Sequence, residues 1–334
     1  MHRSELDRLL TRLNVRLEAV AVCDIGSGMT LEFEPFPYIV VHHVVRGGGI
    51  LEVRGSPPIA FNTDSMLLIP PDRTKRITAG SPPSVRVRTA DHCSAGSGKL
   101  MRLDATDGGD AELIIVCGAI HATCGSFGPF DDLPAPLVED MAAVASIRMA
   151  FRTMLMEHAH PDLCSSALTE SLMKQCLLLF IRRHLTTHGI SSLSLALNDE
   201  RLARALNSIL DRPRDLLRMR DLAASAGMSR SAFAKLFVET LHTTPMEFVR
   251  QTRLQRAAEL LESTDLPVKT IAGEIGYASR SQFCRAFRAA FSTDPSDYRK
   301  RGGRHSPRTA ASSRRPPPVP IFSTHPQTTA SKNA

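Results

Sequence analysis

The spacing of apolar side chains separates the first part of the chain from the second. Residues 4–14 place leucines at helical spacing and predict one short amphipathic helix. From about residue 17 to 125 the apolar runs are short and are interrupted by Gly, Pro, Ser and Asp. Closely spaced runs of this kind, with no helical period between them, are typical of an antiparallel sandwich or barrel. We therefore expect a β-rich domain over 1–130, in which the polar stretch 90–110 forms a surface loop.

After Pro134 the apolar positions follow a helical period. Residues 136–158 and 165–185 each carry an apolar stripe, which predicts a helical hairpin within 131–190. The second helix contains the run CLLLFI and is apolar almost all round, so another surface must cover it. The pattern leaves two coverings open, the β-rich domain or a second copy of the chain in a homodimer. Residues 191–198 are predicted as a linker.

The part of the chain beyond this linker contains an internal repeat. Its two copies, 222–248 and 271–298, align when one residue is inserted at a turn. In the first copy a short apolar-faced helix runs to Gly227, which can take the positive φ of a helix C′ position. Ser229 then fits as the N-cap of a second helix. The second copy repeats the glycine and the serine, so each copy predicts a helix-turn-helix unit.

The exposed face of each second helix is the candidate DNA-reading surface. Arg and Gln side chains can make paired hydrogen bonds to guanine and adenine edges in the major groove, and Ser can donate to bases or phosphates. A charged helix face usually meets only solvent, but this one follows a short turn and recurs about 50 residues later. The candidate residues are Ser229, Arg230, Ser231, Ala234 and Lys235 on a helix at about 229–240, and Ser279, Arg280, Ser281, Gln282, Cys284, Arg285 and Arg288 on a helix at about 279–291.

Charge is distributed unevenly along the chain. The whole chain carries a formal net charge of +7, while residues 199–304 alone carry 19 Lys and Arg against 13 Asp and Glu. A basic C-terminal region behind an acidic-to-neutral front is expected of a nucleic-acid-binding domain. The last segment, 302–334, is rich in Pro, Ser, Thr and Ala and is predicted to be disordered.

Residues 199–301 resemble the DNA-binding domain of the AraC/XylS family of bacterial transcription regulators. The resemblance rests on GMSRSAFAKLF, RLQRAAELLESTDLPVKTIAGEIGY and FRAAFSTDPSDYR. It implies seven helices, with a long one at about 245–262 joining the two units, and Arg253 on that helix is a candidate phosphate contact. Two residues depart from the expected pattern: Arg218 stands where a Ser or Thr cap is expected, and Lys235 replaces an Arg, which removes bidentate geometry.

The front of the chain resembles, more loosely, the cupin-type sensor domain found in one branch of that family. The cues are FPYIVVHHVVRGGGILEVRG, SMLLIPPD and GPFDDLPAPL. The resemblance implies an α+β chain of two domains, in which a cupin-like β-barrel with a helical hairpin precedes an all-α domain with two helix-turn-helix units. The expected division is 1–130 barrel sensor, 131–190 hairpin, 191–198 linker, 199–301 DNA-binding domain and 302–334 tail.

Cupins often hold a metal through an H-x-H…E…H set, and the histidines of the first domain do not follow that pattern. His42 and His43 are adjacent, and neighbours on a strand point to opposite faces, so at most one faces the barrel interior. Glu52 and His121 are wrongly spaced to complete the set. We therefore predict no metal and no cofactor, and keep His42 and His43 as candidate contacts to a small ligand. Seven Cys without a C-x-x-C also disfavour a disulfide framework and structural zinc.

These observations predict a cytoplasmic, sequence-specific DNA-binding transcription regulator that responds to an effector and is not an enzyme. Its expected partners are double-stranded DNA and a small-molecule effector. No membrane association is expected, because no run of about 18 apolar residues occurs. A homodimer and contact with RNA polymerase stay open. The alternatives are a cupin-type metal enzyme fused to a DNA-binding domain, which metal analysis would reveal, and a non-specific architectural DNA binder, which competition with random DNA would reveal.

Overall fold

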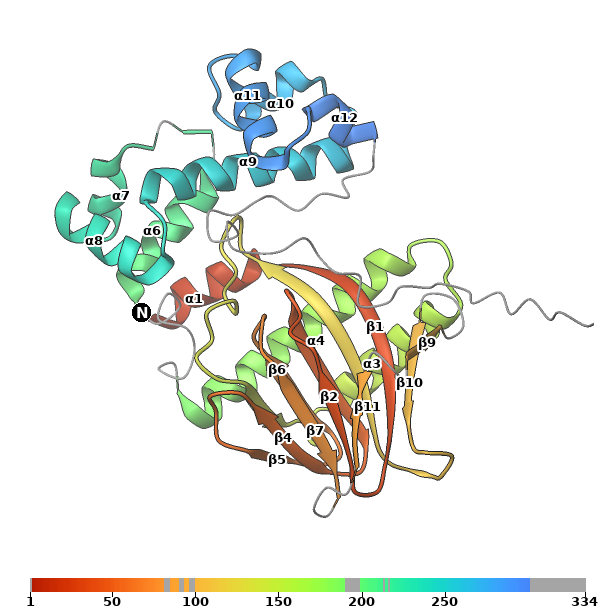
Figure 1. The fold of residues 1–334 in the computed structure, drawn as a ribbon. Coiled ribbons are helices and arrows are strands. Elements are labelled where there is room, and N and C mark those ends of the chain that lie inside the picture. The colour runs from red at the N-terminus through yellow and green to blue at the C-terminus, as the bar shows by residue number, and fades with distance from the viewer. Residues whose placement is uncertain are drawn as a thin grey trace, which may run out of the picture.

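The computed structural model describes residues 2–80, 85–89, 93–95, 100–189, 199–212, 214–215 and 217–300. A β-sandwich forms its first half and a group of helices forms its second (Figure 1). The predicted linker 191–198 and tail 302–334 lie outside the described residues. Within the described residues, the expected order of a β-rich region followed by helices is confirmed. Within the described part no helix is long and apolar enough to cross a membrane.

Two sheets make up the sandwich in the part of the chain that is described. The larger has the order β12-β6-β3-β11-β1-β10-β9, and the smaller has the order β5-β4-β7-β2-β8. The larger sheet contains β1 (Asn14–Gly26), β3 (Ile39–Arg46), β6 (Ser65–Ile69), β9 (Cys93–Ala95), β10 (Leu100–Ala105), β11 (Ala111–Thr123) and β12 (Leu137–Asp140). The smaller contains β2 (Met29–Phe33), β4 (Gly49–Val53), β5 (Ile59–Phe61), β7 (Lys75–Ala79) and β8 (Val85–Arg88).

An apolar core fills the space between these sheets. Side chains alternate across a strand, so one face of each sheet supplies this core, with Leu31, Leu51 and Ile77 from the smaller sheet fully buried. The other face of the larger sheet is covered by α1 (His2–Thr11), α3 (Ala145–Ala159) and α4 (Ser165–His188). The larger sheet is therefore buried on both sides, and the smaller on one.

The stretch 90–110, expected to be a loop, contains two strands, β9 and β10. β10 pairs in parallel with β1, which places it inside the larger sheet. Its buried Leu103 and Ala105 alternate with exposed Arg102 and Asp104, a two-residue period that a flanking Gly-rich sequence obscures. The loop prediction was wrong for residues 100–105 for this reason, and it was also wrong for residues 93–95, which form β9 beside β10.

The helix expected over 136–158 begins only at Ala145. The preceding residues 137–140 form β12, which pairs antiparallel with β6 at the edge of the larger sheet. Four residues are too few to separate a helical from a strand period, which explains the error. Of the two coverings that the sequence leaves open for the second helix, the β-domain is the one observed, because α4 buries Met173, Leu177 and Phe180 against the sheet.

Seven helices follow Asp199 in the described part of the chain, as the resemblance implies. They are α6 (Glu200–Asp211), α7 (Met219–Ser225), α8 (Arg230–Leu241), α9 (Pro245–Ser263), α10 (Val268–Glu274), α11 (Arg280–Phe291) and α12 (Pro295–Lys300). At about 1.5 Å per residue, the 19 residues of α9 span about 28 Å. Figure 1 shows α9 joining a group formed by α6, α7 and α8 to a group formed by α10, α11 and α12.

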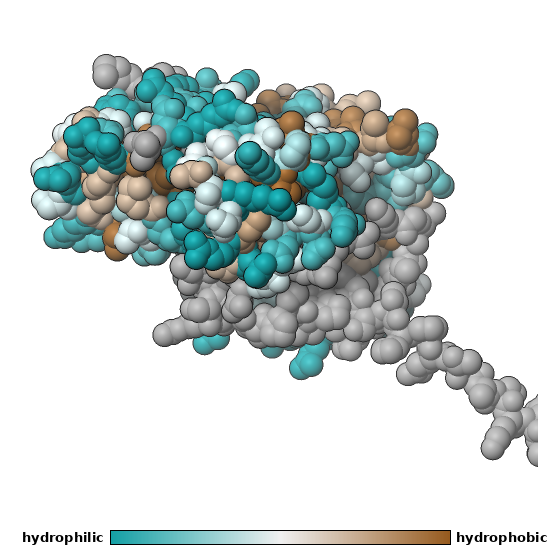
Figure 2. Space-filling view, turned by 90° about the horizontal axis from the view of Figure 1, so that it is seen from above, coloured by the Kyte–Doolittle hydropathy of each residue, from teal (hydrophilic) through white to brown (hydrophobic). Residues whose placement is uncertain are grey.

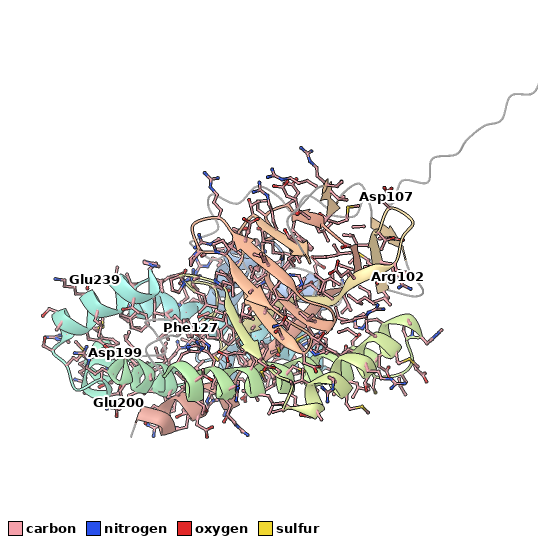
Figure 3. The ribbon with its side chains drawn as sticks, turned by 90° about the horizontal axis from the view of Figure 1, so that it is seen from below. Arg102, Asp107, Phe127, Asp199, Glu200 and Glu239 are labelled. Carbon is pink, nitrogen blue, oxygen red and sulfur yellow. The ribbon has the colours of Figure 1, made fainter. Side chains whose placement is uncertain are left out.

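The first helical group shares its core with the β-domain, and the second does not. One continuous cluster runs from Leu9 of α1 through Leu206 of α6 to Phe237 of α8, whereas the second group closes its own cluster around Phe283 and Phe287. Figure 3 shows the junction from below, with Phe127 between the sheet and the helices and Asp199 and Glu200 at the start of α6. The two helix-turn-helix units therefore rest on separate cores.

Polar contacts reinforce the junction between α1 and α6. The Arg8 guanidinium donates to the Asp211 carboxylate at 2.6 Å, and Arg12 pairs with the same carboxylate. The Asn207 amide, which is buried, donates to the Glu5 carboxylate at 2.7 Å. The N-terminal helix is thus bound to the first helix of the C-terminal domain by both apolar and polar contacts.

Candidate nucleic-acid interface

The turn of the first unit is built as the sequence predicts. Helix α7 ends at Ser225 and is followed by its C-cap Ala226, and Gly227 takes φ +66°, a left-handed conformation that favours glycine. Ser229 is extended and its Oγ accepts a hydrogen bond from the Ala232 amide at 3.3 Å, so it caps α8. At the other end of the unit, where Arg218 lacks a capping hydroxyl, the Asp221 carboxylate accepts from the Arg218 backbone amide at 3.3 Å, and α7 begins at Met219.

The second unit repeats this geometry. Gly276 takes φ +80°, and a Cβ built there would lie 2.8 Å from the Arg214 carbonyl oxygen, so the turn requires glycine for space as well as for conformation. The Ser279 Oγ accepts from the Gln282 amide at 3.3 Å and caps α11. Both second helices therefore start at a fixed angle from a rigid turn.

The two second helices bury and expose corresponding positions. Helix α8 buries Phe233 and Phe237, and α11 buries Phe283 and Phe287 at the same spacing. Residue for residue, 231–240 and 281–290 have the same pattern of burial. Of the candidate residues, the exposed ones are Ser229, Arg230, Ser231, Lys235, Arg280, Ser281, Gln282, Arg285 and Arg288, and the partly buried ones are Ala234, Ser279 and Cys284. Ala232, which corresponds to Gln282, is also exposed and was missed by the sequence reasoning.

Some basic side chains of these faces form internal ion pairs, and others do not. The Arg288 guanidinium donates to the Asp294 carboxylate at 2.6 Å, and the Lys235 ammonium lies 3.9 Å from the Glu239 carboxylate. Among described residues, Arg230, Arg280 and Arg285 have no ion pair or side-chain hydrogen bond. Figure 2, seen from above, shows a largely hydrophilic surface over the C-terminal helices. Arg230, Arg280 and Arg285 are therefore the cations on these faces that can meet DNA without first breaking an internal pair.

Arg253, expected to contact phosphate, has an internal role in the structure. Its half-buried guanidinium donates to the Asp215 carbonyl at 2.7 Å and to the Gly276 carbonyl at 3.4 Å. Burial lowers the pKa of this guanidinium from its usual value. The contact joins α9 to the turn of the second unit, so Arg253 positions the turn that carries α11.

His42, one of the two candidate ligand contacts, faces a cavity of about 90 Å³ in the β-domain. Its Nδ1 lies 2.9 Å from the Cys117 Sγ, which in turn lies 3.5 Å from the Cys23 Sγ. The Lys75 ammonium is buried beside them, 4.8 Å from the centre of the Phe33 ring. Neighbouring His43 points to the opposite side of β3 and stacks on Phe151 of α3, as strand alternation requires.

Burial and mutual contact shift the titration of the groups in this cavity. Desolvation lowers the pKa of Lys75 to about 8. Burial alone would raise the pKa of Cys117, but the hydrogen bond with Cys23 and the nearby His42 and Lys75 lower it well below the usual thiol value. The cavity therefore combines an apolar lining with polar groups that respond to charge.

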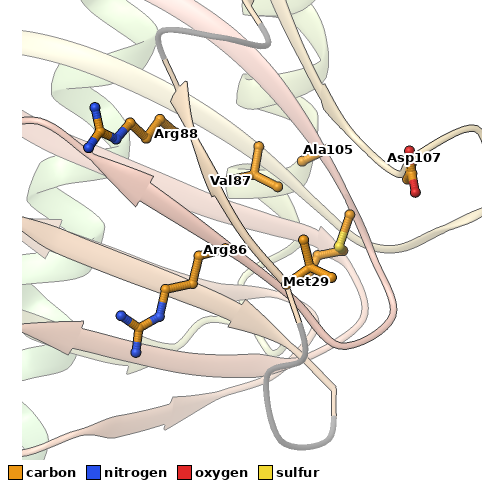
Figure 4. Close-up of a pocket in the computed structure, with 7 residues that line it drawn as sticks. Met29, Arg86, Val87, Arg88, Ala105 and Asp107 are labelled. Carbon is orange, nitrogen blue, oxygen red and sulfur yellow. The ribbon is translucent and has the colours of Figure 1, made fainter.

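The remaining residues considered for a cupin metal set are not brought to this cavity. Glu52 is exposed on β4 of the smaller sheet, and His121 packs edge-on against Tyr38, with ring centres 5.3 Å apart. A second hollow of about 400 Å³ lies beside β8 (Figure 4), where Arg86 and Arg88 extend away from Val87 and Met29. Because the two guanidinium groups point away from the apolar residues of this hollow, they cannot bind a ligand held there, and we assign the hollow no role.

The burial of His43 predicts how the free energy of unfolding depends on pH. Burial lowers its pKa from 6.5 to about 4, although Asp64 acts in the opposite direction. The unfolded chain therefore takes up a proton first, so this contribution to stability is complete above pH 6.5 and is lost as the pH falls toward 4. We expect the free energy of unfolding to decrease by about 3 kcal/mol over that range.

Urea denaturation at a series of pH values measures this loss. His43→Gln, which cannot titrate, should flatten the pH dependence, and the exposed His160→Gln should leave it unchanged. Desolvation also lowers the pKa of His42, so the stability of His43→Gln should still depend on pH, but less steeply than that of the wild type. Equal slopes in all three proteins would contradict the prediction.

Comparison with known proteins agrees with this geometry. A cupin family model matches residues 5–186, and a helix-turn-helix domain model matches residues 222–301. A putative AraC-like transcription regulator of Streptomyces lividans is 28% identical over 308 residues, which cover 88% of this chain and 97% of that protein. An uncharacterised helix-turn-helix regulator of Haemophilus influenzae is 36% identical over 130 residues, 38% of this chain, and the chain spans only 44% of its length.

One solved structure is also similar to part of this chain. The crystal structure of the DNA-binding domain of AdpA in complex with a target DNA is 28% identical, with a TM-score of 0.29, and the match covers 30% of this chain and 89% of that domain. The matched relatives are transcription regulators and not enzymes. The cupin match covers more than half of the chain. With a cupin domain at its N-terminus and a double helix-turn-helix domain behind it, this chain belongs to the AraC family of transcription regulators.

Proposed function

We propose that this regulator recognises a specific duplex site by placing α8 and α11 in successive major-groove segments. The observation that supports the proposal is the repetition of one exposed face on two helices that start from equivalent capped turns. Helix α9 sets their separation, and two recognition helices about one DNA turn apart, roughly 34 Å, meet the same side of the duplex.

The polar residues of the two faces have different roles in DNA recognition, some contacting bases and others phosphates. Arg280 is the first residue of α11, where side chains of a recognition helix reach base edges. Arg285 lies one and a half turns further on, and Gln282 has the donor and acceptor pair that matches adenine. Helix α8 presents Arg230 and Lys235, of which Lys235 acts as a point charge toward phosphate. On this basis α11 contributes more base discrimination than α8.

We further propose that the β-domain responds to a small effector. The cavity beside His42 offers an apolar lining and the buried Lys75 ammonium, which suits a molecule of few heavy atoms with an anionic group. A continuous core and the pairs of Arg8 and Arg12 with Asp211 connect this domain to the first helix-turn-helix unit. An effector can change DNA affinity only by binding one state of the protein better than the other.

Removal of the front 190 residues tests the sensor role. The remaining fragment should still select the same DNA sequence as the full chain, but added small molecules that change binding by the full chain should have no effect on it. Because α6 loses its cover from α1 in this fragment, circular dichroism must first show native helix content. A fragment that keeps the full response would show that the sensor is elsewhere.

Three accompanying features belong to the same proposal. A homodimer is supported by the exposed Met149 and Met156 on α3. Sedimentation of the full chain at micromolar concentration tests the homodimer, and a monomer would be the contrary result.

Contact with RNA polymerase is tested by transcription in vitro, and a cytoplasmic location is tested by cell fractionation. The division at 130, 190 and 199 is tested by limited proteolysis, which should cut first near these positions.

A further inference from the structure

Three potential metal ligands meet where α4 ends against the edge of the larger sheet. The Oε1 atom of Glu139 on β12 lies 2.6 Å from the His184 Nδ1 and 3.1 Å from the His188 Nε2. One ligand atom from each residue lies within 4.8 Å of the others. This cluster is separate from the cavity beside His42, and the DNA-reading faces do not use it.

The fold explains why these residues meet. His184 and His188 are four residues apart on α4, so they lie one above the other on the same face of its last turns. Glu139 is buried on β12, the strand at one end of the larger sheet, and points toward that helix. The helix ends at His188 and is followed by its C-cap Gly189, which has φ +78°.

The polar requirements of the cluster are incompletely met by protein groups. A single carboxylate oxygen faces two imidazole nitrogens, and both Glu139 and His184 are almost fully buried. The other ring nitrogen of His184, Nε2, is buried and has no hydrogen-bond partner among the described residues. Burying a carboxylate is costly unless positive charge or several hydrogen bonds compensate it. The two imidazoles offer hydrogen bonds to the carboxylate, and a divalent cation held by all three side chains would compensate its charge directly.

The donor set and its spacing suit a particular class of ion. Two imidazoles and one carboxylate form an N/O set that zinc and similar divalent transition metals prefer, with bonds of about 2.0–2.2 Å. Tetrahedral ligands at that distance lie about 3.3 Å from one another. The distances of 2.6 and 3.1 Å from Glu139 would need to widen by less than 1 Å. The side chain of His188 is 49% exposed, so the third ligand also opens the cluster to solvent.

We propose that Glu139, His184 and His188 form a binding site for a divalent transition metal ion of the zinc class. The fourth position lies on the solvent side, beside His188. A bound ion would link the edge of the larger sheet to the last turn of α4, directly before the residues that lead to Asp199 and α6. This inference revises the expectation of no metal, which considered only cysteine pairs and the cupin pattern, and it does not depend on the proposed function.

Titration of the metal-free full chain with Co²⁺ tests the site. Cobalt binds zinc sites and reports its ligands by visible absorption, so we expect one saturable Co²⁺ per chain, displaced by Zn²⁺, with the spectrum of nitrogen and oxygen ligands. Saturating Zn²⁺ should also raise the melting temperature, since the ion binds the folded state. In His188→Ala the Co²⁺ affinity should fall at least about 10-fold, because a direct ligand matters no less than the groups that orient it.

Two variants separate loss of the site from loss of the fold. His188 is half exposed, so His188→Ala should keep native circular dichroism, and Glu139→Gln should weaken Co²⁺ binding in the same way if it folds. His160→Ala removes an exposed histidine outside the cluster and should bind as the wild type does. Failure to bind Co²⁺ saturably, equal binding by His188→Ala, or a thiolate-to-cobalt absorption band that assigns the ion to Cys23 and Cys117 would each overturn the proposal.

Discussion

Replacing Phe287 with alanine should unfold the second helix-turn-helix unit while the first stays folded. Phe287 is fully buried on α11, and its ring contacts those of Phe283, Phe291 and Tyr298, with ring centres 5.5, 4.3 and 5.3 Å apart. Removing a phenylalanine from such a core costs about 3–5 kcal/mol. The cluster is separate from the core shared by the first unit and the β-domain, so the loss should be confined to α10, α11 and α12.

Hydrogen exchange of the full chain measures this confinement. Amide protection should fall in 268–300 and remain in α7 and α8. The mirrored variant Phe237→Ala, whose ring packs on Phe233 and Phe248 in the shared core, should instead lower protection in the first unit. Val238→Ala, on the exposed side of α8, should change the stability by less than about 0.5 kcal/mol. Equal loss of protection in both units for Phe287→Ala would contradict the separation of the cores.

The double substitution Arg280→Ala with Arg285→Ala should remove most of the sequence preference contributed by α11. Both guanidiniums are exposed and, in the described part of the chain, have no internal ion pair. A base-reading arginine contributes about 1–3 kcal/mol at its position, so the pair should cost about 2–6 kcal/mol on the preferred site. On random DNA the loss should be much smaller, because random DNA offers only the phosphate contribution.

Arg288→Ala is the matched control. Arg288 lies on the same helix but is paired with Asp294, so its removal should change affinity for the specific site by less than either of the other substitutions. Binding is measured at several salt concentrations on the selected site and on random competitor. If the double variant loses specific and random binding equally, Arg280 and Arg285 contact phosphate and do not read bases.

The helix-turn-helix repeat was predictable from sequence because its structure is encoded locally. Gly227 and Gly276 mark the turns, Ser229 and Ser279 cap the helices, and all four lie within a few residues of what they determine. Strands β9, β10 and β12 were missed because they are short, and β10 and β12 pair with strands far away in the chain. Pairing over such separations decides whether an ambiguous run of six or four residues becomes a strand.

The candidate sites divide in the same way. The exposed faces of α8 and α11 follow from helical period alone, so most of their residues were found. The internal contacts of Arg253 and Arg288 were not, because each partner comes from another element or turn. Cys23, Lys75 and Cys117 come from three different strands and meet only in the folded sandwich. The spacing of His184 and His188 was visible in the sequence, but Glu139 had been placed on a helix.

The separation of the two DNA-reading helices is the central claim, and a hydroxyl-radical footprint of the full chain on its selected site tests it most directly. Two protected segments on one side of the duplex, with centres about one helical turn apart, are the expected result. In Arg280→Ala with Arg285→Ala, protection should weaken in one of the two segments only. A footprint confined to a single half-turn, or one that weakens uniformly in the double variant, would contradict the assignment of α8 and α11 as a pair of recognition helices.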